Sequence, residues 1–202
     1  MVLDIVSWVA VVLIFVSATA ILISHDWRIS LGALAVMYLA AFWLVTRHLP
    51  FAMSTVKLIT GWMVVAILGM TRLGLGETTQ EDTFFPRGIW FRITLMGIVA
   101  LVSIGAAPRI EDAIPGLGLP VIIGGLLLIG GGVAHLGITS DLLRVTLGLL
   151  TVLAGFEIIY AAVESAILVT GLLALVNLGL GILGSYLLVA GSIPLESEED
   201  EA

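Results

Sequence analysis

Long apolar runs restrict the fold of this 202-residue chain more than any other feature. Each run has roughly the 17 to 25 residues that a helix needs to cross the hydrocarbon core of a bilayer. Lipid does not tolerate unpaired backbone groups, so a membrane span is either a helix or a strand of a closed barrel. The runs are continuous, whereas barrel strands alternate between apolar and polar residues. The sequence therefore predicts an all-α integral membrane protein, a bundle of about seven transmembrane helices.

The boundary between the last two runs is the least marked. Only Glu164 and Ser165 separate them, without a Gly or Pro to signal a turn, so six spans is the alternative. A single helix over residues 142–189 would be about twice as long as the bilayer is thick, which favours a reversal near Glu164. The predicted spans are Ile5–Ser24, Ile29–Val45, Phe51–Met70, Ile89–Ala106, Gly118–Leu136, Leu142–Val163 and Ala166–Val189.

The basic residues predict the orientation, because Lys and Arg in short loops are retained on the cytoplasmic side. An N-terminus outside and a C-terminus in the cytoplasm place Arg28, Arg72, Arg87, Arg92 and Arg144 inside and only Arg47 and Arg109 outside. Residues 1–190 are then the helical domain of a multi-pass protein of the cell (cytoplasmic) membrane. Residues 191–202 are expected to be a disordered, acidic cytoplasmic tail, which carries much of the net charge of −7.

Composition argues against most kinds of soluble chemistry. The absence of cysteine excludes disulfides, thiolate metal sites and cysteine nucleophiles. Three dispersed histidines do not have the spacing of a zinc or haem site. The sequence has no phosphate-binding glycine loop and no nucleophile elbow, and its few basic residues form no face for nucleic acid. We therefore expect no catalytic residue, no cofactor and no bound metal, with the lipid bilayer as the surrounding partner.

Two ionisable residues lie well inside predicted spans, where a charge costs roughly 2.5 to 3.5 kcal/mol near the centre of the bilayer. Lys57 is six residues into the third span, about 9 Å below the outer boundary at ~1.5 Å per residue. Glu157 has a similar depth in the sixth span. The predicted topology alone brings a cation and an anion to one level.

This pair has a functional and a structural interpretation. Away from water, a lysine and a glutamate restore each other's charge when they meet, and such a pair can relay protons as neighbouring charges change. Alternatively, the pair is a static salt bridge that fixes helix packing, or Lys57 extends outward and never meets Glu157. Both interpretations stay open at this point.

Three further residues are candidates for an ion path. Asn177 lies near the midplane of the seventh span, where an amide bonds a neighbouring helix or, less commonly, bridges a water chain. Glu164 is one heptad beyond Glu157, but it lies at the predicted turn, where a carboxylate is easily accommodated. His135 lies with Asp141 at the cytoplasmic mouth of the fifth and sixth spans, and Asp141 also suits the N-cap of the sixth.

Glycines concentrate in the fifth and seventh spans. Small residues let membrane helices approach closely, so these spans are expected to pack against protein. An ion path through unwound backbone is the alternative. The glycines concerned are Gly124, Gly125, Gly130, Gly131, Gly132, Gly171, Gly179, Gly181 and Gly184.

Two stretches resemble a known membrane family. The segment Met53-Ser54-Thr55-Val56-Lys57-Leu58-Ile59 resembles the lysine-bearing third helix of the small E-type membrane subunit of multisubunit membrane-bound hydrogenases. The segment Gly137-Ile138-Thr139-Ser140-Asp141-Leu142-Leu143-Arg144, leading through Gly148 to Glu157, resembles the last three helices of that subunit. Residues 117–190 are thus similar to the K subunit of complex I and the C subunit of Mrp antiporters.

The resemblance implies a non-catalytic subunit of a membrane arm that couples electron transfer or antiport to proton or sodium movement. It also implies antiporter-like membrane subunits as partners, and it matches Lys57 and Glu157 to the polar residues of interest. The chain departs from the family pattern in three places. Gly61 stands where the family usually has a proline shortly after the lysine. Glu157 is about one turn farther from Arg144 than the family pattern leads us to expect, and Asn177 stands where an acid is often found. A one-turn shift is enough to take the carboxylate off the family's ion path.

Three functions are therefore compatible with the sequence. The first is an ion-path subunit of a respiratory, hydrogenase-like or antiporter-like complex, with Lys57 and Glu157 as relay groups. The second is a structural or assembly protein whose buried charges only set helix packing. The third is a small self-contained transporter, which the sequence favours least because it has no evident inverted repeat or pair of broken helices.

Overall fold

The computed structural model describes residues 2–75, 88–164 and 166–192, which form seven α-helices and no strand. Each helix is long and apolar enough to cross a membrane. The prediction of a seven-helix membrane protein is confirmed, and the six-span alternative is wrong. The helices are α1 (Val2–Ile23), α2 (Trp27–Val45), α3 (Phe51–Leu75), α4 (Ile89–Ala113), α5 (Leu119–Leu136), α6 (Leu142–Val163) and α7 (Ile167–Ala190).

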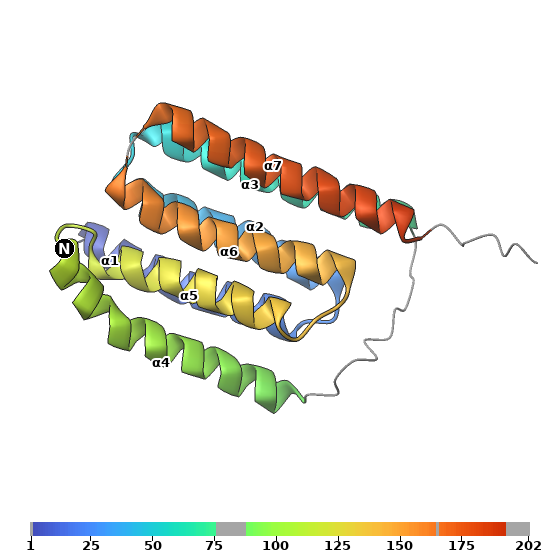
Figure 1. Cartoon of the computed structure of the whole chain (residues 1–202), viewed down its shortest axis with the longest axis horizontal. Coiled ribbons are helices and arrows are strands. Elements are labelled where there is room, and N and C mark those ends of the chain that lie inside the picture. Colours follow the sequence, from blue (N-terminus) through green and yellow to red (C-terminus); the bar gives the residue numbers. More distant parts are fainter. Residues whose placement is uncertain (1, 76–87, 165, 193–202) are drawn as a thin grey trace, which may run out of the picture.

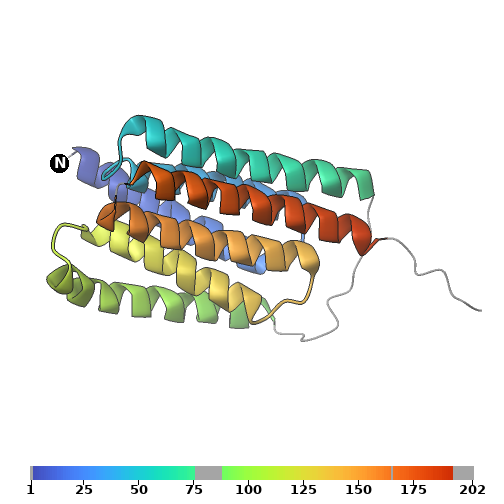
Figure 2. The same cartoon turned by 45° about the horizontal axis from the view of Figure 1, so that its top comes forward.

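The helices form two packed layers. One layer contains α1, α2 and α3 in chain order, and the other contains α4, α5, α6 and α7, also in chain order (Figures 1 and 2). Across the layers, α1 packs on α5, α2 on α6, and α3 on α7, while α4 also contacts α1. This arrangement brings α2, α3, α6 and α7 together in one half of the bundle.

The reversal near Glu164 is present. Glu164 ends α6 with extended backbone angles, and its N–H donates to the Tyr160 carbonyl at 2.9 Å. Two helices extend well past the predicted apolar spans, because α3 continues to Leu75 and α4 to Ala113, five and seven residues beyond the ends of those spans. A helix ends where its backbone bonding ends, and a short polar extension beyond the hydrocarbon core does not interrupt that bonding.

The longer α4 passes through Pro108 and places Glu111 next to the following turn. The Glu111 carboxylate accepts the N–H groups of Gly116 and Gly118 at 3.3 and 2.8 Å. Both glycines have positive φ, which side chains rarely adopt. The carboxylate therefore fixes the turn that returns the chain into α5.

Buried arginines gather at the opposite end of the bundle. Arg92 of α4 donates to the Leu22 carbonyl at 2.8 Å, and Arg144 of α6 donates to the Ser24 carbonyl. Both carbonyls lie at the C-terminus of α1, where backbone acceptors lack partners and the helix dipole favours positive charge. Basic residues thus hold one end of α1. The side of the membrane that this end faces stays a prediction, and Arg87 and the acidic tail from residue 193 lie outside the described residues.

Glycines make the closest helix contacts. A Cβ at Gly132 of α5 would lie 2.8 Å from the Gly148 carbonyl oxygen of α6, and a Cβ at Gly155 would lie 2.6 Å from the Gly125 carbonyl oxygen. Gly125 and Gly132 therefore pack against a neighbouring helix, as predicted, and Gly148 and Gly155 of α6 complete the contact. Gly171 and Gly179 of α7 do not pack in this way, because a Cβ at either position would meet nothing within 4 Å.

Candidate functional site

Lys57 and Glu157 meet inside the bundle. Lys57 Nζ lies 3.6 Å from Glu157 Oε2, and each side chain is only 7% exposed. α3 begins at Phe51 and α6 ends at Val163, so both residues lie six positions, or about 9 Å, from the same end of the bundle. The structure therefore forms the ion pair at the depth expected from the topology, and Lys57 does not extend outward.

Two uncharged side chains extend this pair across the bundle. Tyr38 on α2 donates its hydroxyl to Asn177 Oδ1 on α7 at 2.9 Å, and both residues are buried. Tyr38 and Glu157 also line the same small cavity. Asn177 thus bonds a neighbouring helix, as its position near the midplane predicted. Together, Lys57, Glu157, Tyr38 and Asn177 form a polar cluster with one residue from each of α3, α6, α2 and α7.

Tyr38 did not emerge from the sequence as a site residue, although a signal was available. It lies in the middle of a predicted span, where the hydroxyl of a tyrosine needs a hydrogen-bonding partner. The structure also explains Gly61, since a Cβ there would lie only 2.5 to 2.8 Å from three carbons of the Tyr38 ring. Gly61 therefore makes room for the Tyr38 ring.

A small cavity adjoins the ion pair. It offers about 10 Å³ to the centre of a water molecule and is lined by Tyr38, Ala41, Phe42, Val45, Lys57, Ala154, Glu157 and Ile158. That space is close to the minimum that one water needs. Glu157 Oε1 is buried and accepts no hydrogen bond from any described residue. Because a buried carboxylate oxygen without a donor is costly, the cluster has room and chemical demand for one further donor.

The position of Glu157 depends on the close contact between α5 and α6. Gly155 lies two residues before Glu157, and its missing side chain lets α6 touch the backbone of α5 at Gly125 and Ile129. On α7, the missing side chain of Gly181 similarly leaves room for the Val64 side chain of α3. Backbone contacts of this kind leave little freedom for the helices to slide, so the cluster is held by rigid elements.

The other predicted residues lie away from the polar cluster. Glu164 is exposed at the cap of α6. His135 is buried in the last turn of α5 beside Gly148, nine residues and about 13 Å along α6 from Glu157. Asp141 accepts the Arg144 N–H at 3.0 Å, which confirms its predicted position as the N-cap of α6. The structure therefore joins Lys57, Glu157 and Asn177 but not Glu164 or His135.

The described residues contain no group of three His, Asp or Glu side chains that could hold a metal ion. His48, which lies between α2 and α3, makes a structural contact. Its Nε2 lies 3.0 Å from the Leu117 carbonyl oxygen, which ties the α2–α3 connection to the turn before α5.

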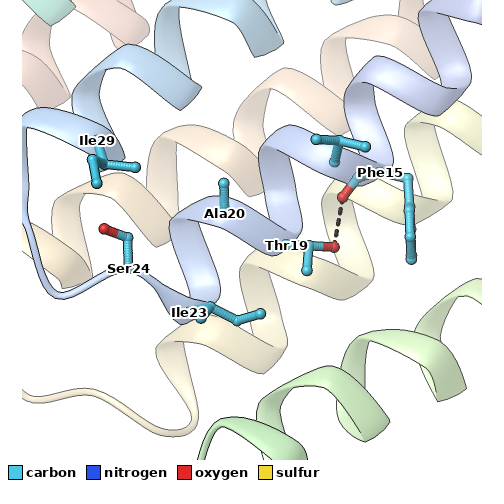
Figure 3. A pocket seen from close by; sticks show the side chains of 7 residues that line it. Phe15, Thr19, Ala20, Ile23, Ser24 and Ile29 are labelled. Carbon is cyan, nitrogen blue, oxygen red and sulfur yellow. Dashed lines mark hydrogen bonds between the residues drawn. The ribbon is translucent and has the colours of Figure 1, made fainter.

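A larger groove of about 470 Å³ lies at the C-terminal half of α1. Its lining is almost entirely apolar, and Thr19 donates its hydroxyl to the Phe15 carbonyl at 2.6 Å within the helix (Figure 3). No charged side chain lines it. This groove presents a surface suited to lipid or to another helix, and it lacks the groups that ion transfer or catalysis requires.

No protein-family model, curated protein or solved structure matches this chain.

Proposed function

We propose that this chain is a non-catalytic membrane subunit of an ion-translocating respiratory, hydrogenase-like or antiporter-like complex of the cell membrane. In this proposal its partners are antiporter-like membrane subunits, and the polar cluster forms part of a proton or sodium path. The resemblance around Lys57 and around Gly137–Arg144 supports the class of complex. The polar cluster supports the role in a proton or sodium path.

The observation that carries the proposal is the state of the buried carboxylate. Glu157 Oε2 is paired with Lys57 at 3.6 Å, while Glu157 Oε1 is buried without a donor among the described residues and adjoins a cavity. A pair that only fixes packing is expected to satisfy both oxygens, because an unsatisfied network is less stable than an apolar core. An incompletely satisfied carboxylate is instead suited to gain and lose a bound cation or proton.

The proposed step is a proton transfer within the pair. Breaking one N–H bond of the Lys57 ammonium and forming an O–H bond on Glu157 leaves a neutral amine and a neutral acid. The 3.6 Å separation must shorten to the roughly 2.7 to 2.9 Å of a charge-assisted hydrogen bond, or a water must bridge it. A charge arriving in a neighbouring subunit can drive this transfer, because electrostatic interactions act strongly across a poorly hydrated interior.

The proposal is tested by purifying the tagged chain from mild detergent with its partners and measuring ion transport in reconstituted vesicles. We expect large antiporter-like subunits to copurify. Lys57→Ala should leave the complex assembled and reduce coupled transport by more than about tenfold, which corresponds to ~1.4 kcal/mol of lost coupling. Ser54→Ala, a change at a buried residue one turn away on α3, is the matched control and should transport normally. Normal transport by an assembled Lys57→Ala complex would refute the relay role.

A structural role is the second candidate, and one contact favours it. α3 packs mainly against α2 and α7, so the ion pair is a specific link between α3 and α6. Removing one partner of a buried pair costs about 3 to 5 kcal/mol, whereas replacing both with apolar residues is often neutral. If the pair only fixes packing, Lys57→Met with Glu157→Leu should restore both the assembly and the transport that either single change impairs. The relay proposal expects the double variant to assemble, as the single variants do, and to remain defective in transport.

A further inference from the structure

We propose that the cavity beside Glu157 holds one water molecule and that the polar cluster exchanges protons and excludes Na⁺. This inference rests on the proposed ion-path function and names the ion that the path carries. The hydrogen-bonding groups around the cavity and the ligands that Na⁺ would require support it.

The cavity has hydrogen-bonding partners for a single water. Glu157 Oε1 needs a donor, and the Lys57 ammonium can donate to the oxygen of a water beside it. The Tyr38 hydroxyl already donates its proton to Asn177, so its oxygen is available only as an acceptor. One water can therefore donate to Glu157 and to Tyr38 and accept from Lys57. Three such partners are typical of buried waters, and a space of about 10 Å³ admits no second molecule.

The same geometry is unsuitable for Na⁺. Membrane sites for this ion use backbone carbonyls from unwound helix segments, but Tyr38, Lys57, Glu157 and Asn177 all lie within continuous helices whose carbonyls bond internally. Asn177 Oδ1 already accepts from Tyr38, which leaves the Glu157 carboxylate and the Tyr38 oxygen as ligands. Hard cations of similar size take six or more oxygens.

The charge of Lys57 also opposes Na⁺. A second cation on Glu157 would lie close to the ammonium that already pairs with it at 3.6 Å. At the effective dielectric constant of a protein site, this repulsion weakens binding on the order of a thousandfold. A proton avoids the cost, because it binds covalently to an oxygen or nitrogen of the pair and needs no coordination shell.

Among the described residues, two groups that titrate lie beside Glu157, namely Lys57 on α3 and Tyr38 on α2. Asn177 on α7 does not titrate, and His135 on α5 lies about 13 Å away along the helix axis. A carboxylic-acid infrared band that is lost in Glu157→Gln can therefore be assigned to this residue without ambiguity from its neighbours.

The identity of the ion is tested on the whole chain in lipid nanodiscs. The carboxylic-acid band of Glu157 is followed as the pH changes, once in Na⁺ and once in K⁺ at the same ionic strength. We expect the midpoint to differ by less than about 0.1 pH unit, since Na⁺ does not compete with the proton. If Na⁺ bound Glu157, each tenfold increase in its concentration would lower the midpoint by up to about one pH unit. Such a shift would overturn the inference, as would the absence of any titrating band that Glu157→Gln removes. Neither result depends on partners, so a failure here is distinct from a failure of the transport test.

The water is tested in the same samples by an O–H stretching band that shifts in H₂¹⁸O when Glu157 changes protonation. Ala41 lines the cavity, and Ala41→Val should fill it and abolish the band. Ala40→Val changes the neighbouring buried alanine, which does not line the cavity, and should keep the band. A wild-type protein without an isotope-sensitive band, or a band that persists in folded Ala41→Val, would contradict the proposed water.

Discussion

Gly155→Ala is expected to disturb both the stability of the bundle and the geometry of the polar cluster. A Cβ at this position would lie 2.6 Å from the Gly125 carbonyl oxygen and 2.8 Å from the Ile129 nitrogen. Both are backbone atoms of α5, so no side-chain rotation can relieve the contact. Ordinary van der Waals contact begins near 3.4 Å. The shorter of these two distances is 0.8 Å less, so α6 must move away from α5 by about that amount.

The magnitude follows from two opposing effects. Overpacking a rigid contact costs about 1 to 3 kcal/mol, because it strains the backbone or separates well-packed surfaces. Alanine gains about 0.5 to 1 kcal/mol over glycine in a helix interior. The net loss is then about 1 kcal/mol at the centre of these ranges and about 2.5 kcal/mol at most. The displaced α6 also carries Glu157, two residues away, and 0.8 Å is a large fraction of its 3.6 Å separation from Lys57.

The assay is reversible unfolding of the purified chain in mixed micelles, monitored by circular dichroism. Gly179→Ala is the matched control, since it places the same methyl group in α7 where a Cβ meets nothing within 4 Å. We expect Gly179→Ala to be neutral or stabilising by up to about 1 kcal/mol. A Gly155→Ala protein as stable as Gly179→Ala would show that the close approach of α5 and α6 has been misjudged.

Two further substitutions test single hydrogen bonds. Tyr38→Phe leaves the buried Asn177 Oδ1 without its donor and should cost about 1 to 3 kcal/mol in the same unfolding assay, with Asn177→Leu in the Tyr38→Phe background recovering part of the loss. An unchanged midpoint for Tyr38→Phe would argue against the bond. Asp141→Ala removes the side-chain acceptor of the Arg144 N–H and should cost about 1 kcal/mol, whereas Asp141→Asn should retain most of the stability.

The transmembrane spans were predictable because their cause is local in the sequence. A run such as Leu142–Val163 is helical in lipid whatever its neighbours are, and α6 has these same bounds. The ends of α3 and α4 were not predictable in this way. Arg72 and Arg109 are the first charged residues after these apolar runs, but both are compatible with a helix that extends past the hydrocarbon core.

The site was predictable only in part. Charges within a span are rare enough that Lys57 and Glu157 stand out, and the two helices between α3 and α6 make those two run in opposite directions, which sets the relative depth of the two residues. Tyr38 is different, because a tyrosine in an apolar run is as consistent with core packing as with a polar contact. Its partner Asn177 is 139 residues away, and only the packing of α2 between α3 and α6 brings the two together.

The packing of α3 against α7 has a consequence for the direction of any ion movement. Below Gly61 and Asn177, the next hydroxyl-bearing residues on these two helices are Thr71 and Ser185, which contact each other. The intervening stretch, about 12 Å at ~1.5 Å per residue, is sealed by Val64 and Leu68, both fully buried. A narrow apolar stretch blocks ions by excluding water. The contact between α3 and α7 is therefore apolar from the polar cluster down to Thr71 and Ser185, and a charge could not cross that distance along these two helices alone.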